Sequence, residues 1–125
     1  MSQFEARQWL YDQLVALDMS GVNVYKYALE NVAAPCVMIA DSDPVLQIAT
    51  VGNSTADMAL RLVCLVPQLD TEAAVSGLEL ITDLLLLGLP KEKLQFSIVG
   101  ATSTMTIGVS DYYSRDIPVT MRIEL

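Results

Sequence analysis

The sequence predicts an α+β fold, in which a mixed or antiparallel β-sheet of about five strands carries two α-helices on one face. Three observations support this prediction: a helical pattern near the start of the chain, an alternating strand that leads into a leucine-rich helix, and alternating segments near the end. The chain has 125 residues, of which 53% are hydrophobic. It is therefore long enough for one domain, residues 1–125, with a substantial core.

The first segment is predicted to be a helix that runs toward Gly21. Ser2 and Glu5 have the spacing of a capping box, which satisfies the free amide groups at a helix start. One hydrophobic stripe at helical spacing consists of Ala6, Leu10, Leu14 and Leu17. A second hydrophobic stripe consists of Phe4, Tyr11 and Val15. This second stripe packs either within the monomer or against another subunit, and the sequence leaves both alternatives open.

Two short strands and a long connection are predicted next. Residues 22–27 alternate and are rich in β-branched and aromatic side chains, and residues 36–40 form a short apolar run. Residues 41–55 contain Asp-Ser-Asp-Pro and Gly-Asn-Ser-Thr, which favour turns, so we expect a long, mobile loop. The hydrophobic residues of this loop, which are candidates for contact with a partner, are Val45, Leu46 and Ile48.

The middle of the chain predicts a strand followed by a helix. Residues 58–66 place every second side chain on one hydrophobic face, and Pro67 ends the strand. Asp70 then caps a helix that runs to about Leu87, before Gly88. The core stripe of this helix consists of Ala74, Leu78, Ile81 and Leu85. Further leucines widen the hydrophobic arc beyond one sheet-facing stripe and are candidates for a subunit interface: Leu80, Leu86 and Leu87.

The C-terminal part predicts antiparallel strands. Residues 96–98 and 105–109 alternate on either side of a segment rich in Gly, Thr and Ser, which predicts a hairpin between them. Residues 117–125 form a half-buried strand, in which Pro118 favours an edge or a strand end. Ser114, Arg115 and Asp116 are expected to form a surface turn.

Composition excludes several function classes. Without histidine, the chain lacks the usual general base near neutral pH and the Ser-His-Asp and Cys-His arrangements. Cys36 and Cys64 lie in apolar runs, so we expect buried thiols in a reducing compartment. A net charge of −8 disfavours binding to a nucleic acid backbone. The N-terminus lacks the basic and apolar regions of a secretory signal, and the apolar run at residues 84–89 is too short to cross a membrane.

Two groups of carboxylates are the remaining candidates for chemistry. Asp41, Asp43 and Asp57 are oxygen ligands that suit a hard cation, but their spacing does not match an EF-hand and a turn is favoured. Glu79 and Asp83 lie one helical turn apart, yet no nucleophile or phosphate-binding loop accompanies them. The sequence therefore predicts no catalytic residue, no cofactor site and no metal ligand, and we do not expect an enzyme.

The order of the segments resembles the tail terminator proteins of bacteriophages with long, non-contractile tails. The resemblance covers nearly the whole chain and lies in the combination of segments. After the short N-terminal helix, these segments are Pro-Cys-Val-Met-Ile at residues 35–39, an Asp-Pro loop, Ala-Leu-Arg-Leu-Val-Cys-Leu-Val-Pro at residues 59–67, Gln-Leu-Asp-Thr-Glu-Ala-Ala at residues 68–74 before the Leu-rich helix, and Tyr112-Tyr113 before the last strand.

This resemblance implies a structural subunit without catalytic residues or cofactors. Such subunits assemble in the host cytoplasm as a homo-oligomeric ring, commonly a hexamer, on the last ring of the tail tube protein. The ring ends tail polymerisation and offers a surface to the head-tail connector protein, at the upper end of the tail in the virion. DNA would pass through without specific binding, which the acidic composition allows.

Three alternative functions remain compatible with the sequence. A head completion or connector subunit of a tailed phage would share the size and the lack of chemistry. A small non-viral binding module predicts a monomer or dimer with an apolar pocket, and a carboxylate-based enzyme predicts perturbed acids in a cleft. The ring subunit predicts instead a large interface between copies of the chain.

Overall fold

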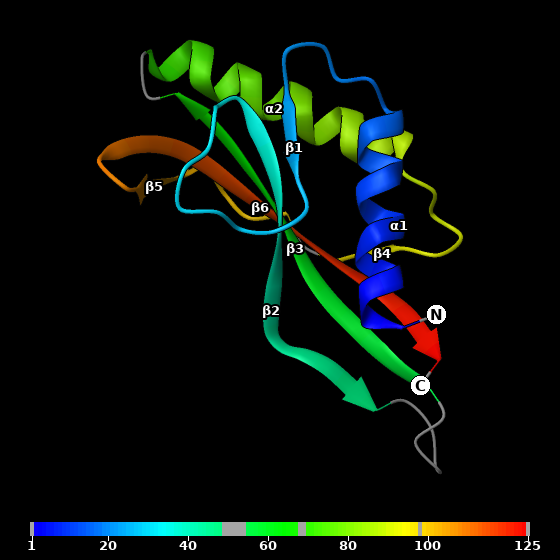
Figure 1. Ribbon diagram of the computed structural model, residues 1–125. Helices are drawn as coiled ribbons and strands as arrows, with labels where there is room; N and C mark the ends of the chain where they lie inside the picture. The colour runs from blue at the N-terminus through cyan, green and yellow to red at the C-terminus, as the bar shows by residue number, and fades with distance from the viewer. Residues whose placement is uncertain (1, 49–54, 68–69, 98, 125) are drawn as a thin grey trace.

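The computed structural model describes residues 2–48, 55–67, 70–97 and 99–124 and has an α+β fold (Figure 1). The elements follow in the order α1 (Gln3–Ala16), β1 (Asn23–Tyr25), β2 (Cys36–Ile48), β3 (Thr55–Pro67), α2 (Thr71–Gly88), β4 (Gln95–Phe96), β5 (Ser103–Ile107) and β6 (Ser110–Glu124). The predicted fold class is confirmed, with a mixed sheet of six strands instead of about five.

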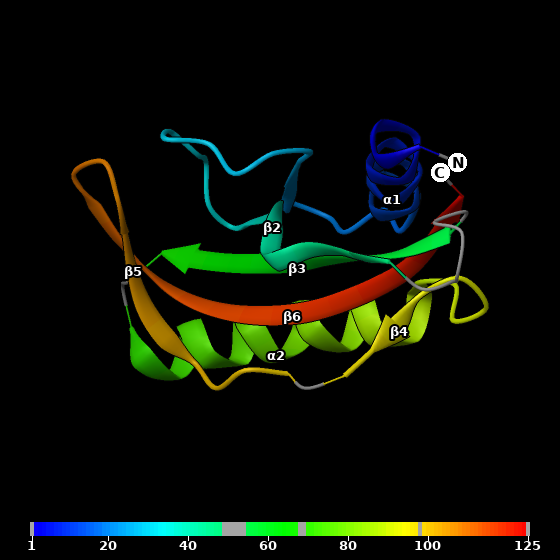
Figure 2. The same cartoon turned by 90° about the horizontal axis from the view of Figure 1, so that it is seen from below.

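Strands β3 and β6 form the centre of the sheet. They pair antiparallel along their whole length, from Thr55 opposite Glu124 to Pro67 opposite Tyr112. The strand order is β1-β2-β3-β6-β4, and β5 also pairs with β6; only β1 and β2 run parallel. Figure 2 shows α2 along one side of the long strands, while the turn between β5 and β6 bends toward the other side.

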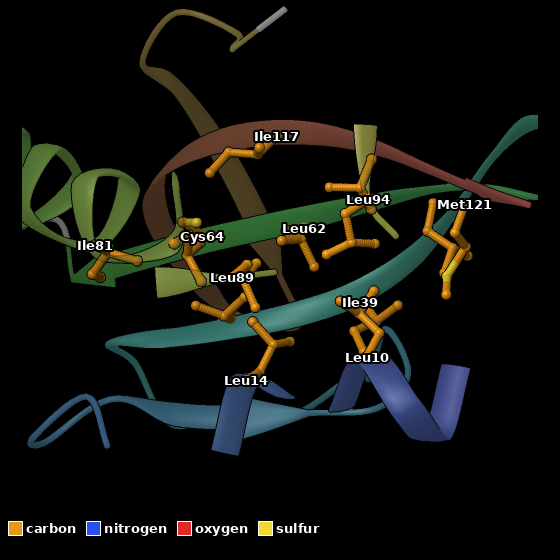
Figure 3. Close-up of a cluster of buried hydrophobic side chains, with 14 of the residues drawn as sticks. Leu10, Leu14, Ile39, Leu62, Cys64, Ile81, Leu89, Leu94, Ile117 and Met121 are labelled. Atoms are coloured by element: carbon orange, nitrogen blue, oxygen red, sulfur yellow. The ribbon is translucent and has the colours of Figure 1, made fainter. Parts of the chain in front are cut away.

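Both helices pack on the same face of the sheet. In Figure 3, Leu10 and Leu14 of α1 and Ile81 of α2 point into the cluster that contains Leu62 and Ile117 of the sheet. Each fully buried leucine contributes about 2 kcal/mol to the stability of such a core. The predicted core stripes are confirmed except at Leu17, which is only half-buried at the end of α1. The buried members are Ala6, Leu10, Leu14, Ala74, Leu78, Ile81 and Leu85.

The two helix starts are also confirmed. The Ser2 hydroxyl accepts a hydrogen bond from the Glu5 amide at 3.2 Å, and the Ser2 amide donates to the Glu5 carboxylate at 3.3 Å. These bonds hold the pKa of Glu5 below its usual value. Asp70 caps α2 by accepting from the Ala73 amide at 3.4 Å. Helix α1 ends earlier than predicted, because Leu17 is its C-cap and Asp18 has a φ of 50°.

A buried arginine, which periodicity did not predict, joins α1 to the edge of the sheet. Arg7 donates from Nη1 to the carbonyl oxygens of Lys26 and Ile39, both at 2.9 Å, and from Nη2 to the Asp41 carboxylate. Its guanidinium also stacks 4.7 Å from the centroid of the Tyr27 ring. These contacts satisfy the charge although Arg7 is only 8% exposed.

The opposite face of the sheet has a smaller hydrophobic cluster and ion pairs that are partly exposed to solvent. The cluster contains Cys36, Met38, Ala40, Val63 and Leu65, with partial cover from Tyr25, Val32, Met105, Ile107 and Tyr112. Two ion pairs join neighbouring strands: Arg61 with Asp116 at 2.9 Å, and Arg122 with Asp57 at 3.0 Å. This face therefore needs no helix above it.

The long loop predicted at residues 41–55 is wrong for the part that the structure describes. Strand β2 continues through Ile48, with Leu46 opposite Met58 and Ile48 opposite Ala56. The Asp-Ser-Asp-Pro sequence lies in a register shift between Asp41 and Leu46, so turn-favouring residues form a bulge inside the strand. Residues 49–54 lie outside the described residues.

The predicted hairpin between residues 96–98 and 105–109 is also wrong. Strands β4 and β5 both pair with β6, one after the other along its outer side. The hairpin joins β5 to β6 instead, through Gly108, whose φ is 63°. The glycine at the turn was therefore the stronger signal for the hairpin. Ile98 and Leu125, which also entered these predictions, lie outside the described residues.

Strand β6 corrects two further expectations. Pro118 lies inside this central strand rather than at an edge or strand end, in the stretch between the residues that pair with β5 and with β4. Ser114, Arg115 and Asp116 form part of the strand, not a surface turn. Ser114 is only 2% exposed, and its hydroxyl hydrogen-bonds to the Ser103 hydroxyl at 3.1 Å.

Candidate functional site

The exposed leucines of α2 form one continuous stripe. Leu80, Leu84 and Leu87 are spaced by four and three residues, so they share a side of the helix. Their exposed fractions are 63%, 41% and 80%. The core contacts of α2 come from another side of the helix, through Leu78 and Leu85. The three exposed leucines, called here the α2 stripe, are therefore not needed to complete the core.

Two of the three leucines that the sequence suggested for this surface belong to the α2 stripe, and the third does not. Leu80 and Leu87 are exposed, as the wide hydrophobic arc indicated. Leu86 is half-buried and packs against the core cluster, whereas Leu84, which the prediction missed, belongs to the stripe. The helical phase of the core residues was the signal that places Leu84 between Leu80 and Leu87.

A hydrophobic groove adjoins the α2 stripe. It has a volume of about 320 Å³ and lies between α2, the end of β3 and the segments before β1 and β2. Its lining includes Val22, Pro35, Val66, Gly77 and Leu80. Because Leu80 belongs to both features, the groove and the stripe form one continuous apolar surface.

Acidic side chains border the α2 stripe. Glu79 and Asp83 are exposed on the flank of the helix, together with Glu72 in its first turn. In the described part of the chain, ion pairs join Arg7 to Asp41, Arg61 to Asp116 and Arg122 to Asp57. The acids beside the stripe take part in none of these pairs. Their charges are therefore free to attract a cation on another molecule.

A second exposed surface lies on α1. Phe4 is 65% exposed and Val15 is 52% exposed, and Tyr11 lies between them on the same side of the helix. The Lys26 ammonium lies 5.7 Å from the centroid of the Phe4 ring and 5.4 Å from that of Tyr11, and it donates to Gln8. These four residues, Phe4, Tyr11, Val15 and Lys26, are called here the α1 patch.

The two cysteines are buried, as predicted, and belong to different clusters. Cys64 lies on the helix-covered face and Cys36 on the other face, so their side chains point apart and both thiols are free. Burial raises the pKa of Cys36 to about 11 and that of Cys64 to about 12. Both are neutral thiols at neutral pH and are poor nucleophiles.

The three aspartates considered as cation ligands are engaged separately or exposed. Asp41 pairs with Arg7, Asp57 pairs with Arg122, and Asp43 is exposed in the bulge of β2. Over residues 2–48, 55–67, 70–97 and 99–124, no three His, Cys, Asp or Glu side chains lie close enough together to hold a metal ion.

The candidate contact residues near the end of β2 are only partly accessible. Val45 and Leu46 are half-buried and pack against the core cluster, whereas Ile48 is 51% exposed. Ile48 is thus the member of this group that a partner reaches most easily. Among the described helices, none combines the length and the apolar character that crossing a membrane requires.

No family model and no curated protein matches this chain. The α2 stripe, the groove and the α1 patch are therefore interpreted from their own chemistry.

Proposed function

We propose that this chain is a structural subunit of a phage with a long, non-contractile tail. It forms a ring, commonly a hexamer, that caps the tail tube, ends tail polymerisation and offers the surface to which the head-tail connector joins. The observation that carries the proposal is the α2 stripe, because it leaves large leucines in water beside a core that is already complete. The order of the sequence segments supports the more specific role in the tail.

Capping is a binding function, so it depends on surfaces rather than on reacting groups. A ring on the last ring of tube protein occupies the site at which the next tube ring would add. Such a subunit needs affinity for its own copies, for the tube protein and for the connector. The α2 stripe and the adjoining groove supply apolar area for the first of these contacts.

The first test measures the native mass of the chain by sedimentation velocity, alone and with its tube protein. We expect a ring, and we expect Leu80→Glu or Leu84→Glu to leave folded monomers, because a buried, unpaired carboxylate opposes association. Val109→Glu is the matched control, since Val109 is fully exposed at the β5–β6 turn, away from α2. A wild-type chain that stays monomeric under both conditions contradicts the proposal.

The second test separates the terminator from a connector subunit. In a phage from which this gene is deleted, loss of a terminator should give tails of abnormal length. Loss of a connector should instead give tails of normal length that do not join heads. Complementation by the wild-type gene, scored by electron microscopy, should restore tails of uniform length joined to heads.

A small binding module remains the second candidate, because the groove of about 320 Å³ is large enough for part of an apolar ligand. This alternative expects a monomer or dimer whose groove binds such a ligand. Bulky substitution of Gly77, which lines the groove, would then block ligand binding without changing the native mass.

A further inference from the structure

The α2 stripe and the α1 patch, two exposed hydrophobic surfaces within the described residues, differ in charge. The α2 stripe is bordered by Glu79 and Asp83, which form no ion pair within the described residues. The α1 patch has Lys26 at its centre, between two aromatic rings, and Lys26 also forms no ion pair there. One surface therefore offers leucines beside negative charge, and the other offers aromatic and aliphatic side chains around a positive charge.

We propose that copies of this chain associate head to tail, with the α1 patch of one copy on the α2 stripe of the next. The inference rests on the proposed assembly and names the surfaces that form it. In this contact Phe4 and Val15 cover the leucines of the stripe, and the Lys26 ammonium approaches the Asp83 carboxylate.

A second copy is the occupant that the charges favour. If two α2 stripes met antiparallel about a two-fold axis, the acidic flanks of both helices would lie on the same side of the contact, which is unfavourable. The α1 patch brings a cation to these acids instead. Glu5 and Asp12 lie at the border of the patch, where the Glu5 carboxylate accepts from the Ser2 amide at 3.3 Å and the Asp12 carboxylate accepts from the Gln8 side chain at 2.9 Å, whereas Lys26 lies between the aromatic rings.

The arrangement of the helices suits a ring. A cyclic assembly of more than two copies needs two different surfaces on each subunit, one for each neighbour. Figure 1 shows that α1 and α2 run in different directions, with α1 beside one end of the sheet and α2 along it. A contact between them therefore propagates from copy to copy, and it closes into a ring when the rotation per subunit divides a full turn.

The proposal is tested by mixing two assembly-defective chains. Leu87→Glu inactivates the α2 stripe, and Val15→Glu inactivates the α1 patch; both residues are more than half exposed, so the fold should remain. Each variant alone should be monomeric. Their mixture should give dimers and nothing larger, because only the intact patch of one and the intact stripe of the other can meet. Sedimentation velocity at high protein concentration distinguishes these species.

A charge exchange tests the predicted ion pair. Lys26→Glu and Asp83→Lys should each weaken assembly about tenfold or more, and the double variant should recover most of the loss, as coupling between close charges requires. Asp111→Lys, at an exposed acid on β6 near the hairpin turn, makes the same charge change as Asp83→Lys and is the control, which should not weaken assembly. Circular dichroism checks that each variant is folded.

The outcomes separate this inference from the proposed function. If the wild-type chain forms rings but the mixture of Leu87→Glu and Val15→Glu stays monomeric, the head-to-tail contact is overturned while the ring remains. If either variant still forms rings alone, its surface is not the interface. If the wild-type chain is monomeric with and without tube protein, the proposed function itself fails.

Discussion

One buried polar side chain, that of Arg7, fixes the position of α1 against the sheet. Arg7 lies beside the hydrophobic residues of the α1 core stripe and binds two carbonyl oxygens and a carboxylate at the edge of β2. Hydrophobic periodicity assigns a charged residue to the solvent side of a helix, so it provides no signal for the burial of Arg7. The contact depends on where the open edge of β2 lies, and only the fold determines that.

The buried thiols make stability depend on alkaline pH. Well below pH 9, both are protonated in folded and unfolded chains, so they contribute no pH dependence there. Between pH 9 and about 11 the unfolded chain loses these protons while the folded chain keeps them. The free energy of unfolding should therefore fall as pH rises, by up to about 1.4 kcal/mol per pH unit for each thiol.

Urea unfolding under reducing conditions measures this effect. A Cys36→Ala/Cys64→Ala variant is the control, since it differs from the wild-type chain only in lacking the two thiols. Its stability should fall less steeply between pH 9 and pH 11 than that of the wild-type chain. Equal slopes for the two proteins would mean that burial does not hold the thiols protonated.

At the scale of elements, the parts with one strong periodic pattern were predictable. Strand β3 and helix α2 have unbroken patterns of period 2 and 3.6, with proline, aspartate and glycine at their ends, and the structure places both as expected. The pairing of β4 and β5 was not predictable in this way. Alternation shows that a segment is a strand but does not identify the strand with which it pairs. Here β4 and β5 both pair with β6.

Residues that favour turns were misleading where they lie inside a long strand, as in β2. The Asp-Ser-Asp-Pro sequence favours a turn in isolation, but pairing on both sides of the bulge keeps β2 in register with β3 as far as Ile48. For the α2 stripe, an excess of leucine was not a sufficient signal. The helical phase of the core stripe is also needed to distinguish the exposed Leu84 from the half-buried Leu86.

Two glycines should respond in opposite ways to the same substitution. Gly77 lies inside α2, where an added Cβ would meet Val66 at an ordinary 3.6 Å, so Gly77→Ala should stabilise the monomer by up to about 1 kcal/mol. Gly108 has a φ of 63° in the hairpin turn, so Gly108→Ala should cost about 1 kcal/mol through backbone strain.

These two substitutions are best compared by urea unfolding in the Leu87→Glu background, where assembly does not contribute to stability. Gly108 has room for a Cβ, because the nearest backbone oxygen, that of Glu30, would be 3.7 Å away. A loss of stability at Gly108 is thus attributable to φ rather than to a clash. A gain in stability for Gly108→Ala, or a loss for Gly77→Ala, would refute this account of the hairpin turn and the helix.

At the scale of the whole molecule, net charge opposes the association that the apolar surfaces favour. Each subunit carries −8, so every copy added to an assembly increases the repulsion. Salt screens this repulsion wherever the exposed charges are farther apart than the Debye length, which is about 10 Å at 0.1 M salt. The proposed contact between Lys26 and Asp83 acts at short range within an apolar interface and is screened much less.

Moderate salt should therefore promote assembly rather than weaken it. We expect the fraction of assembled chain to increase as ionic strength rises from about 0.01 M to about 0.15 M, because the Debye length falls from about 30 Å to about 8 Å. Sedimentation velocity at fixed protein concentration measures this fraction. The Lys26→Glu/Asp83→Lys variant keeps the same net charge and should respond alike. A steady decrease with salt would instead mean that charge attraction, and not the α2 stripe, supplies most of the binding energy.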